Sequence, residues 1–316
     1  MENDAPVVFV IVVSYNGAAW VERCFGSLRK SAHPVQTILV DNHSTDSTVS
    51  DVRRRFPEVH IIANAANAGF GKANNQGIAF ALARGANVFF LLNQDAWIEP
   101  DTIASMLMVL PSFPQAGIFS PMHYTGSGNA LDYNFERYLL RDARPEAVRQ
   151  WTGATIPQGH PVSFVNAAAW MIPKHCLEKI GGFGPLFFHY GEDHDFVQRM
   201  NYFGLSTVVV TATKIFHDRE HRSPDTLRST PAKLFRYYFI GTLVRLADIR
   251  SAFILRLAWI VYWNLREATA LLLKGRWIAP FTALVVLSRS IGKIPSVLRY
   301  RAEVSGNYRY RFLNGN

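Results

Sequence analysis

Cysteine is nearly absent from this chain of 316 residues, which contains only Cys24 and Cys176. Each lies inside an apolar or helical pattern, and the two are far apart in the sequence. Two such cysteines argue against the disulfide framework that stabilises small secreted domains, and against a zinc site built from cysteine pairs. We therefore expect the protein to work in a reducing compartment.

Long apolar runs are also missing. The apolar stretches between the charged residues of the last third of the chain are shorter than the roughly 20 residues that a membrane-spanning helix needs. At the N-terminus, Glu2 and Asp4 lead directly into a predicted strand, so no positively charged leader precedes an apolar core. These absences predict a cytosolic protein.

Acidic residues are scarce in one part of the chain only. Residues 231–316 hold 14 Lys and Arg against 3 Asp and Glu, whereas residues 1–230 hold 19 against 21. The formal net charge of +9 therefore comes from the last segment. We expect a domain boundary near Pro231, with a catalytic domain over 1–230 and a basic, amphipathic helical segment over 231–316.

The first hundred residues alternate short apolar segments with helical patterns. Each apolar segment ends in polar residues, which is typical of the parallel strands of an α/β fold. Less regular strands and helices follow, among them a strand over Val162–Ile172 and a helix over Glu192–Phe203. The pattern predicts a single Rossmann-like, mostly parallel sheet flanked by helices. The first four strands are expected at Val7–Val13, Thr37–Val40, Val59–Ile62 and Val88–Leu92.

Ligands of open α/β sheets bind beyond the carboxyl ends of the strands, and this chain places polar groups there. Asp41 ends the second strand and is suited to accept hydrogen bonds from a base or a ribose. The following Ser44, Thr45 and Asp46 can equally be a helix N-cap. The Asn- and Gly-rich segment 64–77 can present backbone N–H groups to phosphate, with Lys72 as an added charge, or it can be a plain loop.

Asp95 follows the fourth strand, after Asn93 and Gln94. One carboxylate can hold Mg²⁺ or Mn²⁺ when phosphates supply other oxygens, although Asp95 can also be a helix-start residue. His217, at the end of the last strand, can complete such a site with a neutral imidazole. Glu192, Asp193 and Asp195 begin a helix, where acids are favoured by the dipole. Their crowding is expected to raise pKa values and suits a general base.

Six segments occur in a characteristic order and spacing over roughly residues 6–225. They are Val13-Ser14-Tyr15-Asn16, Val40-Asp41-Asn42-His43-Ser44-Thr45-Asp46, Asn67-Ala68-Gly69-Phe70-Gly71 with Asn74 or Asn75, Leu91–Asp95, Gly181-Gly182-Phe183, and Glu192-Asp193-His194-Asp195. Together they resemble the family 2 glycosyltransferases, which are inverting enzymes of the GT-A fold, and especially their rhamnosyltransferase-like branch.

The resemblance implies a role for each matching residue. Asp95 and His217 would bind a divalent metal, magnesium or manganese, where Asn93-Gln94-Asp95 matches the Asp-x-Asp motif of the family with one acid replaced. Asp193 would be the catalytic base, paired with Glu192. Tyr15 and Asp41 would contact the nucleotide base. The donor-binding residues would be Ser14, Tyr15, Asn16, Asp41, Asn67, Gly69, Lys72, Asn74, Asn93 and Gln94.

The implied activity is that of a hexosyltransferase acting in bacterial surface polysaccharide synthesis. The donor would be dTDP-rhamnose or a UDP-sugar, and the acceptor a lipid-linked glycan at the cytoplasmic face of the membrane. The basic, Trp-rich tail suits a membrane surface, but it can also be a helical subdomain packed on the sheet or a homodimer interface. No nucleic-acid module accompanies the charge. A non-catalytic nucleotide-sugar-binding protein or a membrane-surface adaptor are the alternative functions.

Overall fold

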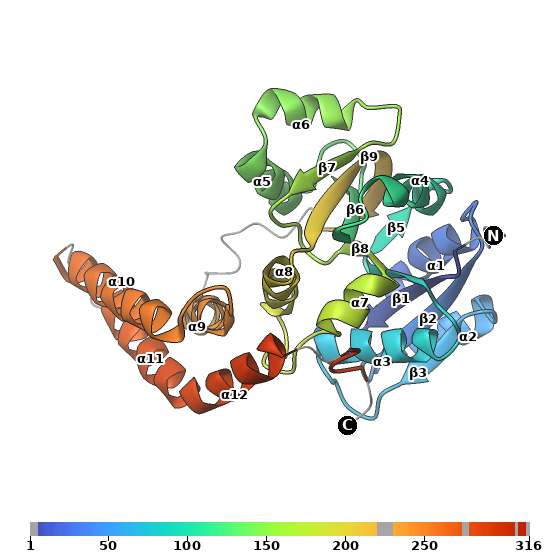
Figure 1. Ribbon diagram of the computed structural model, residues 1–316. Coiled ribbons are helices and arrows are strands. Elements are labelled where there is room, and N and C mark those ends of the chain that lie inside the picture. The colour runs from blue at the N-terminus through green and yellow to red at the C-terminus, as the bar shows by residue number, and fades with distance from the viewer. Residues whose placement is uncertain (1–5, 220–229, 274–277, 307–308, 314–316) are drawn as a thin grey trace.

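The computed structural model describes residues 6–219, 230–273, 278–306 and 309–313 (Figure 1). A nine-stranded mixed sheet forms its centre, with the strand order β3-β2-β1-β4-β8-β6-β9-β5 and β7 paired to β9. Helices cover both faces of this sheet, and four more helices lie to one side of it. The α/β fold class expected from the sequence is confirmed.

The first half of the sheet is parallel. Strands β1 (Val8–Ser14), β2 (Val35–Asp41), β3 (His60–Ala63) and β4 (Val88–Asn93) pair in parallel, and their carboxyl ends meet at one edge. The connecting helices are α1 (Val21–Arg29), preceded by the 3₁₀ turn Ala18–Trp20, then α2 (Thr48–Arg55) and α3 (Phe70–Leu82). All four predicted strands are present to within one or two residues.

The second half mixes strand directions. Strand β8 (Ala169–Pro173) runs antiparallel to β4, and β6 (Ala116–Thr125) runs parallel to β9 (Ser206–His217). Two short strands, β5 (Ala96–Ile98) and β7 (Gly159–Val162), pair antiparallel with β9. The expected single strand over Val162–Ile172 is wrong, because its two ends pair with different strands and residues 163–168 connect them.

The segment between β6 and β7 contains helices. Helix α5 (Tyr133–Asp142) buries Phe135 and Leu139, which are four residues apart on one face, and α6 (Pro145–Thr152) follows it. This segment is therefore largely helical. Helices α4 (Thr102–Val109), with the 3₁₀ turn Leu110–Ser112 after it, α7 (Lys174–Ile180) and α8 (Glu192–Tyr202) complete this part.

Two apolar cores lie on the two faces of the sheet. One joins α1, α2 and α4 to alternate residues of the central strands, such as Val10 and Phe90. The other joins α3, α7, α8 and α5 to the intervening residues, such as Ile11 and Leu91. Because successive strand residues point to opposite faces, strands covered on both sides must be apolar throughout. The continuous apolar runs of β1 and β4 meet that requirement.

The chain after residue 230 is helical. The helices are α9 (Pro231–Ala247), α10 (Phe253–Leu273), α11 (Ile278–Gly292) and α12 (Ile294–Ser305). Residues of α9, α10 and α12 form a third apolar cluster, to which Phe187 also contributes. Within the described residues, none of the helices combines the length and apolarity needed to cross a bilayer. In Figure 1 these helices lie beyond α8, with α10 and α11 pointing away from the sheet.

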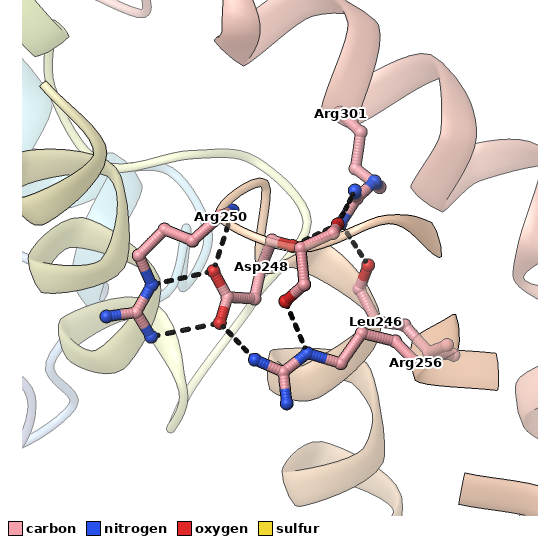
Figure 2. A network of polar contacts seen from close by, with 6 residues as sticks. Leu246, Asp248, Arg250, Arg256 and Arg301 are labelled. Carbon is pink, nitrogen blue, oxygen red and sulfur yellow. Dashed lines mark hydrogen bonds and ion pairs between the residues drawn. The ribbon is translucent and has the colours of Figure 1, made fainter. Parts of the chain in front are cut away.

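A buried carboxylate organises the turn between α9 and α10. Asp248 accepts hydrogen bonds from Arg250 and Arg256, and it is only 2% exposed (Figure 2). Arg301 of α12 donates to the carbonyl oxygens of Leu246, Asp248 and Ser251. The burial of Asp248 would raise its pKa, but its bonds to Arg250 lower it below the usual range. This network fixes the direction in which α10 leaves the α9 turn.

A second buried network attaches α12 to α8. Arg199 donates from Nε to Asp195 at 2.9 Å, and from Nη1 and Nη2 to the carbonyl oxygens of Ile180 and Gly182, each at 2.8 Å. The hydroxyl of Tyr300 donates to the same Asp195 oxygen at 2.6 Å. Asp195 and Arg199 are each 1% exposed, so the ion pair is shielded from water. It joins α8, the loop after α7 and α12 at one point.

Replacing Arg199 with methionine is expected to destabilise the protein by about 3–5 kcal/mol, because it leaves the buried Asp195 carboxylate without its counter-charge. Urea unfolding followed by tryptophan fluorescence measures the change. Arg149→Met is the matched control, since its ion pair with Glu146 is exposed and should contribute less than about 1 kcal/mol. Equal losses in both variants would contradict a structural role for the Arg199 network.

Candidate active site

Gln94 connects the carboxyl ends of β1 and β4. Its side-chain oxygen accepts a hydrogen bond from Ser14 Oγ at 2.5 Å and from the Tyr15 N–H at 3.0 Å. Its amide nitrogen donates to the Tyr15 carbonyl at 3.3 Å. Gln94 therefore fixes the backbone of the first loop, while the half-exposed ring of Tyr15 is accessible to a ligand.

Asp41, at the end of β2, is almost completely buried. Its carboxylate accepts from the Ser44 N–H at 2.9 Å and from Ser44 Oγ at 2.5 Å. Ser44 Oγ in turn accepts from the Asn16 N–H at 2.9 Å, and Asn16 Oδ1 accepts from the Thr45 N–H at 2.8 Å. Asn16 and Asp41 thus hold the first two loops together. A ribose hydroxyl that bound Asp41 would have to share the carboxylate with these hydrogen bonds.

The Asn- and Gly-rich loop before α3 lies against the second of these loops. Asn42 donates to the Gly69 carbonyl at 3.3 Å and accepts from the Ala68 N–H at 3.2 Å, while Asn67 accepts from the Gly69 N–H at 2.9 Å. Gly69 has a φ of +83°, and a β-carbon there would approach the Phe188 carbonyl to 2.3 Å. Only glycine fits this position without strain.

Three polar residues of α3 have different surroundings. Lys72 is exposed in the first turn. Asn74 is buried and donates within the helix to the Phe70 carbonyl at 3.0 Å. Asn75 exchanges two hydrogen bonds of 2.8 Å with the Phe183 backbone, so it holds the loop after α7 against α3. Of these three, only Lys72 offers its polar group to solvent near the loop.

His217, the last residue of β9, is fully buried between two carboxylates. Its Nε2 lies 3.3 Å from Asp95 Oδ1, and its Nδ1 lies 3.4 Å from Asp132 Oδ2. The amide nitrogen of Asn93 is 3.5 Å from the same Nε2, and Arg219 Nε is 3.8 Å from Asp95 Oδ2. The structure therefore brings Asn93, Asp95 and His217 together, as the resemblance implies.

Asp132 was not predicted from the sequence. It is the N-cap of α5 and accepts hydrogen bonds from the N–H groups of Asn134 and Phe135. Burial would raise its pKa, but the neighbouring His217 lowers it well below the usual range. Asp132 is therefore a carboxylate beside the His217 ring, with Oδ2 3.4 Å from Nδ1. In the sequence, the only indication of Asp132 is that an Asp precedes an amphipathic helical run.

Asp95 and His217 are compatible with a divalent cation. Neighbouring ligands of an octahedral ion bound at 2.0–2.1 Å stand about 3 Å apart, which is close to the separation of these two atoms. A hydrogen bond from Nδ1–H to Asp132 would leave Nε2 free to bind metal. Within the described residues, no three His, Cys, Asp or Glu side chains form a group that could hold an ion. A metal here would need further oxygens from a ligand such as a diphosphate.

The acids of α8 lie beside the loop before α3. Gly191, with a φ of +94°, turns the chain into this helix. Glu192 is 5% exposed, and its β-carbon lies 3.7 Å from the position of a β-carbon built on Gly71. Asp193 is more exposed, and its Oδ1 accepts from the His194 N–H at 2.8 Å and lies 2.9 Å from His194 Nδ1.

The two acids titrate in opposite directions. Burial, together with the charge of Asp193, raises the pKa of Glu192 to about 8. Burial would also raise the pKa of Asp193, but the charge and hydrogen bonds of His194 lower it below its ordinary value. The expectation that crowding raises the pKa values is confirmed for Glu192 and wrong for Asp193. At neutral pH Asp193 is ionised and can accept a proton, whereas Glu192 is protonated.

The fold that positions these groups resembles the folds of solved enzymes that bind nucleotide sugars. The mannosyltransferase PcManGT from Pyrobaculum calidifontis, in complex with GDP-Man and Mn²⁺, aligns with a TM-score of 0.57 and 18% identity, over 96% of this chain and 81% of that one. TarS 1–349 of S. aureus aligns with a TM-score of 0.55 and 14% identity, over 96% and 89%. Both likenesses concern the fold.

Sequence comparison defines the family. Residues 9–180 match the model of glycosyl transferase family 2, so the chain belongs to this family and is a glycosyltransferase. The chain is also 26% identical over 288 residues to an N-acetylglucosaminyl-diphospho-decaprenol L-rhamnosyltransferase of Mycobacterium tuberculosis, covering 84% of this chain and 91% of that protein. The resemblance to family 2, and to its rhamnosyltransferase-like branch, is confirmed.

The raised pKa of Glu192 predicts that stability falls as pH rises. Because the folded state keeps this proton up to about pH 8 while the unfolded chain loses it near 4.5, the stabilisation is complete below pH 4.5 and is lost between the two values. Glu192→Gln should remove this slope, which can reach about 1.4 kcal/mol per pH unit. Urea unfolding across pH measures it. The exposed Glu136→Gln is the control, and an unchanged slope in Glu192→Gln would refute the assignment.

Proposed function

We propose that the protein is an inverting glycosyltransferase that moves a sugar from a nucleotide-sugar donor to a hydroxyl of a lipid-linked glycan in bacterial surface polysaccharide synthesis. The observation that supports this best is the convergence of three groups at one sheet edge. Gln94 joins the Tyr15 loop to Asp95, Asn42 joins the Asp41 loop to Gly69, and Gly71 contacts the region of Glu192. The residues proposed for the donor, the metal and the base thus lie on connected loops at this sheet edge.

Asp193 is the proposed catalytic base. Its lowered pKa keeps the carboxylate ionised at neutral pH, and the side chain is 20% exposed while Oδ1 pairs with His194. It would remove the proton of the acceptor hydroxyl as that oxygen attacks the anomeric carbon from the face opposite the leaving diphosphate. Protonated Glu192 would donate a hydrogen bond within the same site. A single displacement of this kind inverts the anomeric configuration.

The residues proposed for the donor lie around the strand ends. Tyr15 would stack on the base, with Ser14, Asn16 and Asp41 fixing the loops that surround the nucleoside. The loop from Asn67 to Gly69 would lie beside the diphosphate, where the exposed Lys72 would add a positive charge. Asp95 and His217 would hold a magnesium or manganese ion, which when bound offsets the charge developing on the departing diphosphate. Neutral Asn93 and the nearby Arg219 reduce the negative charge at this position.

The donor and acceptor classes rest on the relative from Mycobacterium tuberculosis. Its name specifies transfer of L-rhamnosyl to an N-acetylglucosaminyl-diphospho-decaprenol. We therefore favour dTDP-rhamnose as donor, with a UDP-sugar as the other candidate, and an acceptor sugar joined through a diphosphate to a polyprenol. TarS binds UDP-GlcNAc in a solved complex, which is why the UDP-sugar stays in the comparison.

Asp193→Asn should lower kcat for transfer by at least about 100-fold, because the amide cannot accept the proton of the acceptor hydroxyl. Donor binding, measured by isothermal titration, should stay near that of the parent protein. Asp101→Asn, at an exposed helix start, is the matched control for loss of one surface charge. Normal turnover by Asp193→Asn would eliminate Asp193 as the base.

Asp95→Asn should weaken the Mn²⁺-dependent part of nucleotide binding, since it removes the carboxylate that lies 3.3 Å from His217 Nε2. Titration of UDP and dTDP, each with and without Mn²⁺, measures that part directly and needs no acceptor. Asp101→Asn again serves as control. If Asp95→Asn keeps the full Mn²⁺ enhancement, the metal does not bind at Asp95.

A further inference from the structure

Helix α10 exposes a mainly apolar and aromatic side. Ile254 is 77% exposed, Leu255 69% and Tyr262 60%, and Trp259, Trp263 and Leu265 are also exposed. The opposite side of the helix, with Phe253, Leu257 and Ile260, packs into the third apolar cluster. We call the exposed side the α10 face; it consists of Ile254, Leu255, Trp259, Tyr262, Trp263 and Leu265.

The spacing of the α10 face shows that it is one continuous strip. Leu255, Trp259 and Tyr262 follow each other at intervals of four and three residues, so they lie along one line of the helix. Figure 1 shows α10 and α11 extending away from the sheet. A contiguous apolar surface of this kind on a soluble domain marks an interaction site.

The charged side chains that contact the Trp rings of the α10 face are positive. The guanidinium of Arg266 lies 4.8 Å from the centre of the Trp263 ring, and that of Arg245 lies 5.8 Å from the Trp259 ring. No Asp or Glu occurs between residues 249 and 266. The preceding acid, Asp248, is buried under Arg250 and Arg256 (Figure 2). The negative charge of Asp248 is therefore buried, whereas Arg245 and Arg266 beside the Trp rings of the α10 face are exposed.

We propose that the α10 face docks on an anionic lipid surface. Trp and Tyr side chains combine an apolar ring with a polar group and are enriched where hydrocarbon meets water, while arginines beside them pair with lipid phosphates. The helix would lie in the plane of the bilayer surface, with its apolar side in the headgroup region. The excess of basic residues in 231–316 complements such a surface, whereas two copies of this cationic face would repel each other.

This inference deepens the proposed function and rests on it in one respect, namely the lipid-linked acceptor. Docking through α10 would place the enzyme at the surface from which an acceptor diphosphate projects. The buried Asp195 with Arg199 and Tyr300 joins α12 to the helix of the catalytic acids, so the docked helices and the acid pair are parts of one connected unit.

The test is flotation of the full chain with vesicles of phosphatidylcholine, with and without phosphatidylglycerol. We expect binding to the anionic vesicles and weak binding to the neutral ones. Leu255→Glu combined with Trp259→Glu should lower anionic-vesicle partitioning by at least about tenfold, because two apolar anchors are lost and two negative charges are gained. Met108→Glu, on α4 and 67% exposed, is the matched control and should bind as the parent does.

Two further measurements make the outcome decisive. Nucleotide binding by the double variant should be normal, which shows that it is folded and separates a failure of docking from a failure of the proposed function. Light scattering reports the oligomeric state of both proteins. Unchanged vesicle binding by the double variant overturns the proposal. If the parent protein is a dimer, the double variant is a monomer and neither binds vesicles, the α10 face contacts a second copy of the chain. This result also overturns the proposal.

Discussion

The buried ion pair between Asp195 and Arg199 is the contact on which the arrangement of the site depends. Arg199 also donates to the carbonyl oxygens of Ile180 and Gly182, and the Tyr300 hydroxyl donates to Asp195. Because charged groups in a dry interior are tolerated only when fully paired, these partners cannot separate without a large cost. The start of α8, which presents Glu192 and Asp193, is therefore fixed from its buried side by the same contact that attaches the C-terminal helices.

Three carboxyl groups of the site, Asp132, Asp193 and Glu192, have shifted pKa values in contrasting environments. Asp132 is ionised against His217, Asp193 is ionised against His194, and Glu192 is kept protonated by burial next to Asp193. Environments that separate pKa values in this way distinguish acids by role within one site. A base that is ionised at neutral pH beside a neutral hydrogen-bond donor suits removal of a proton from a sugar hydroxyl, which is the step the proposed reaction requires.

The parallel half of the sheet could be predicted from the sequence because each strand is a continuous apolar run that ends in polar residues, such as Asp41 and Asn93. The antiparallel half could not. Gly117 and Pro121 weaken the strand pattern of β6, and the apolar stretch over Val162–Ile172 gives no indication that it is divided between two strands. The pairing of Asp95 with His217 followed from motif order. Asp132 could not be predicted as a site residue, because its contact with His217 joins two distant parts of the chain. Its local sequence pattern indicates only a helix N-cap.

We propose that Asp95 and His217 supply two ligands of a metal site that a donor diphosphate completes. The most direct test is a crystal structure of the protein soaked with Mn²⁺ and dTDP or UDP, with anomalous diffraction data collected at the manganese absorption edge. We expect one anomalous peak within bonding distance of Asp95 Oδ1 and His217 Nε2, and in contact with the diphosphate. A bound nucleotide with no manganese peak between these two residues would contradict it.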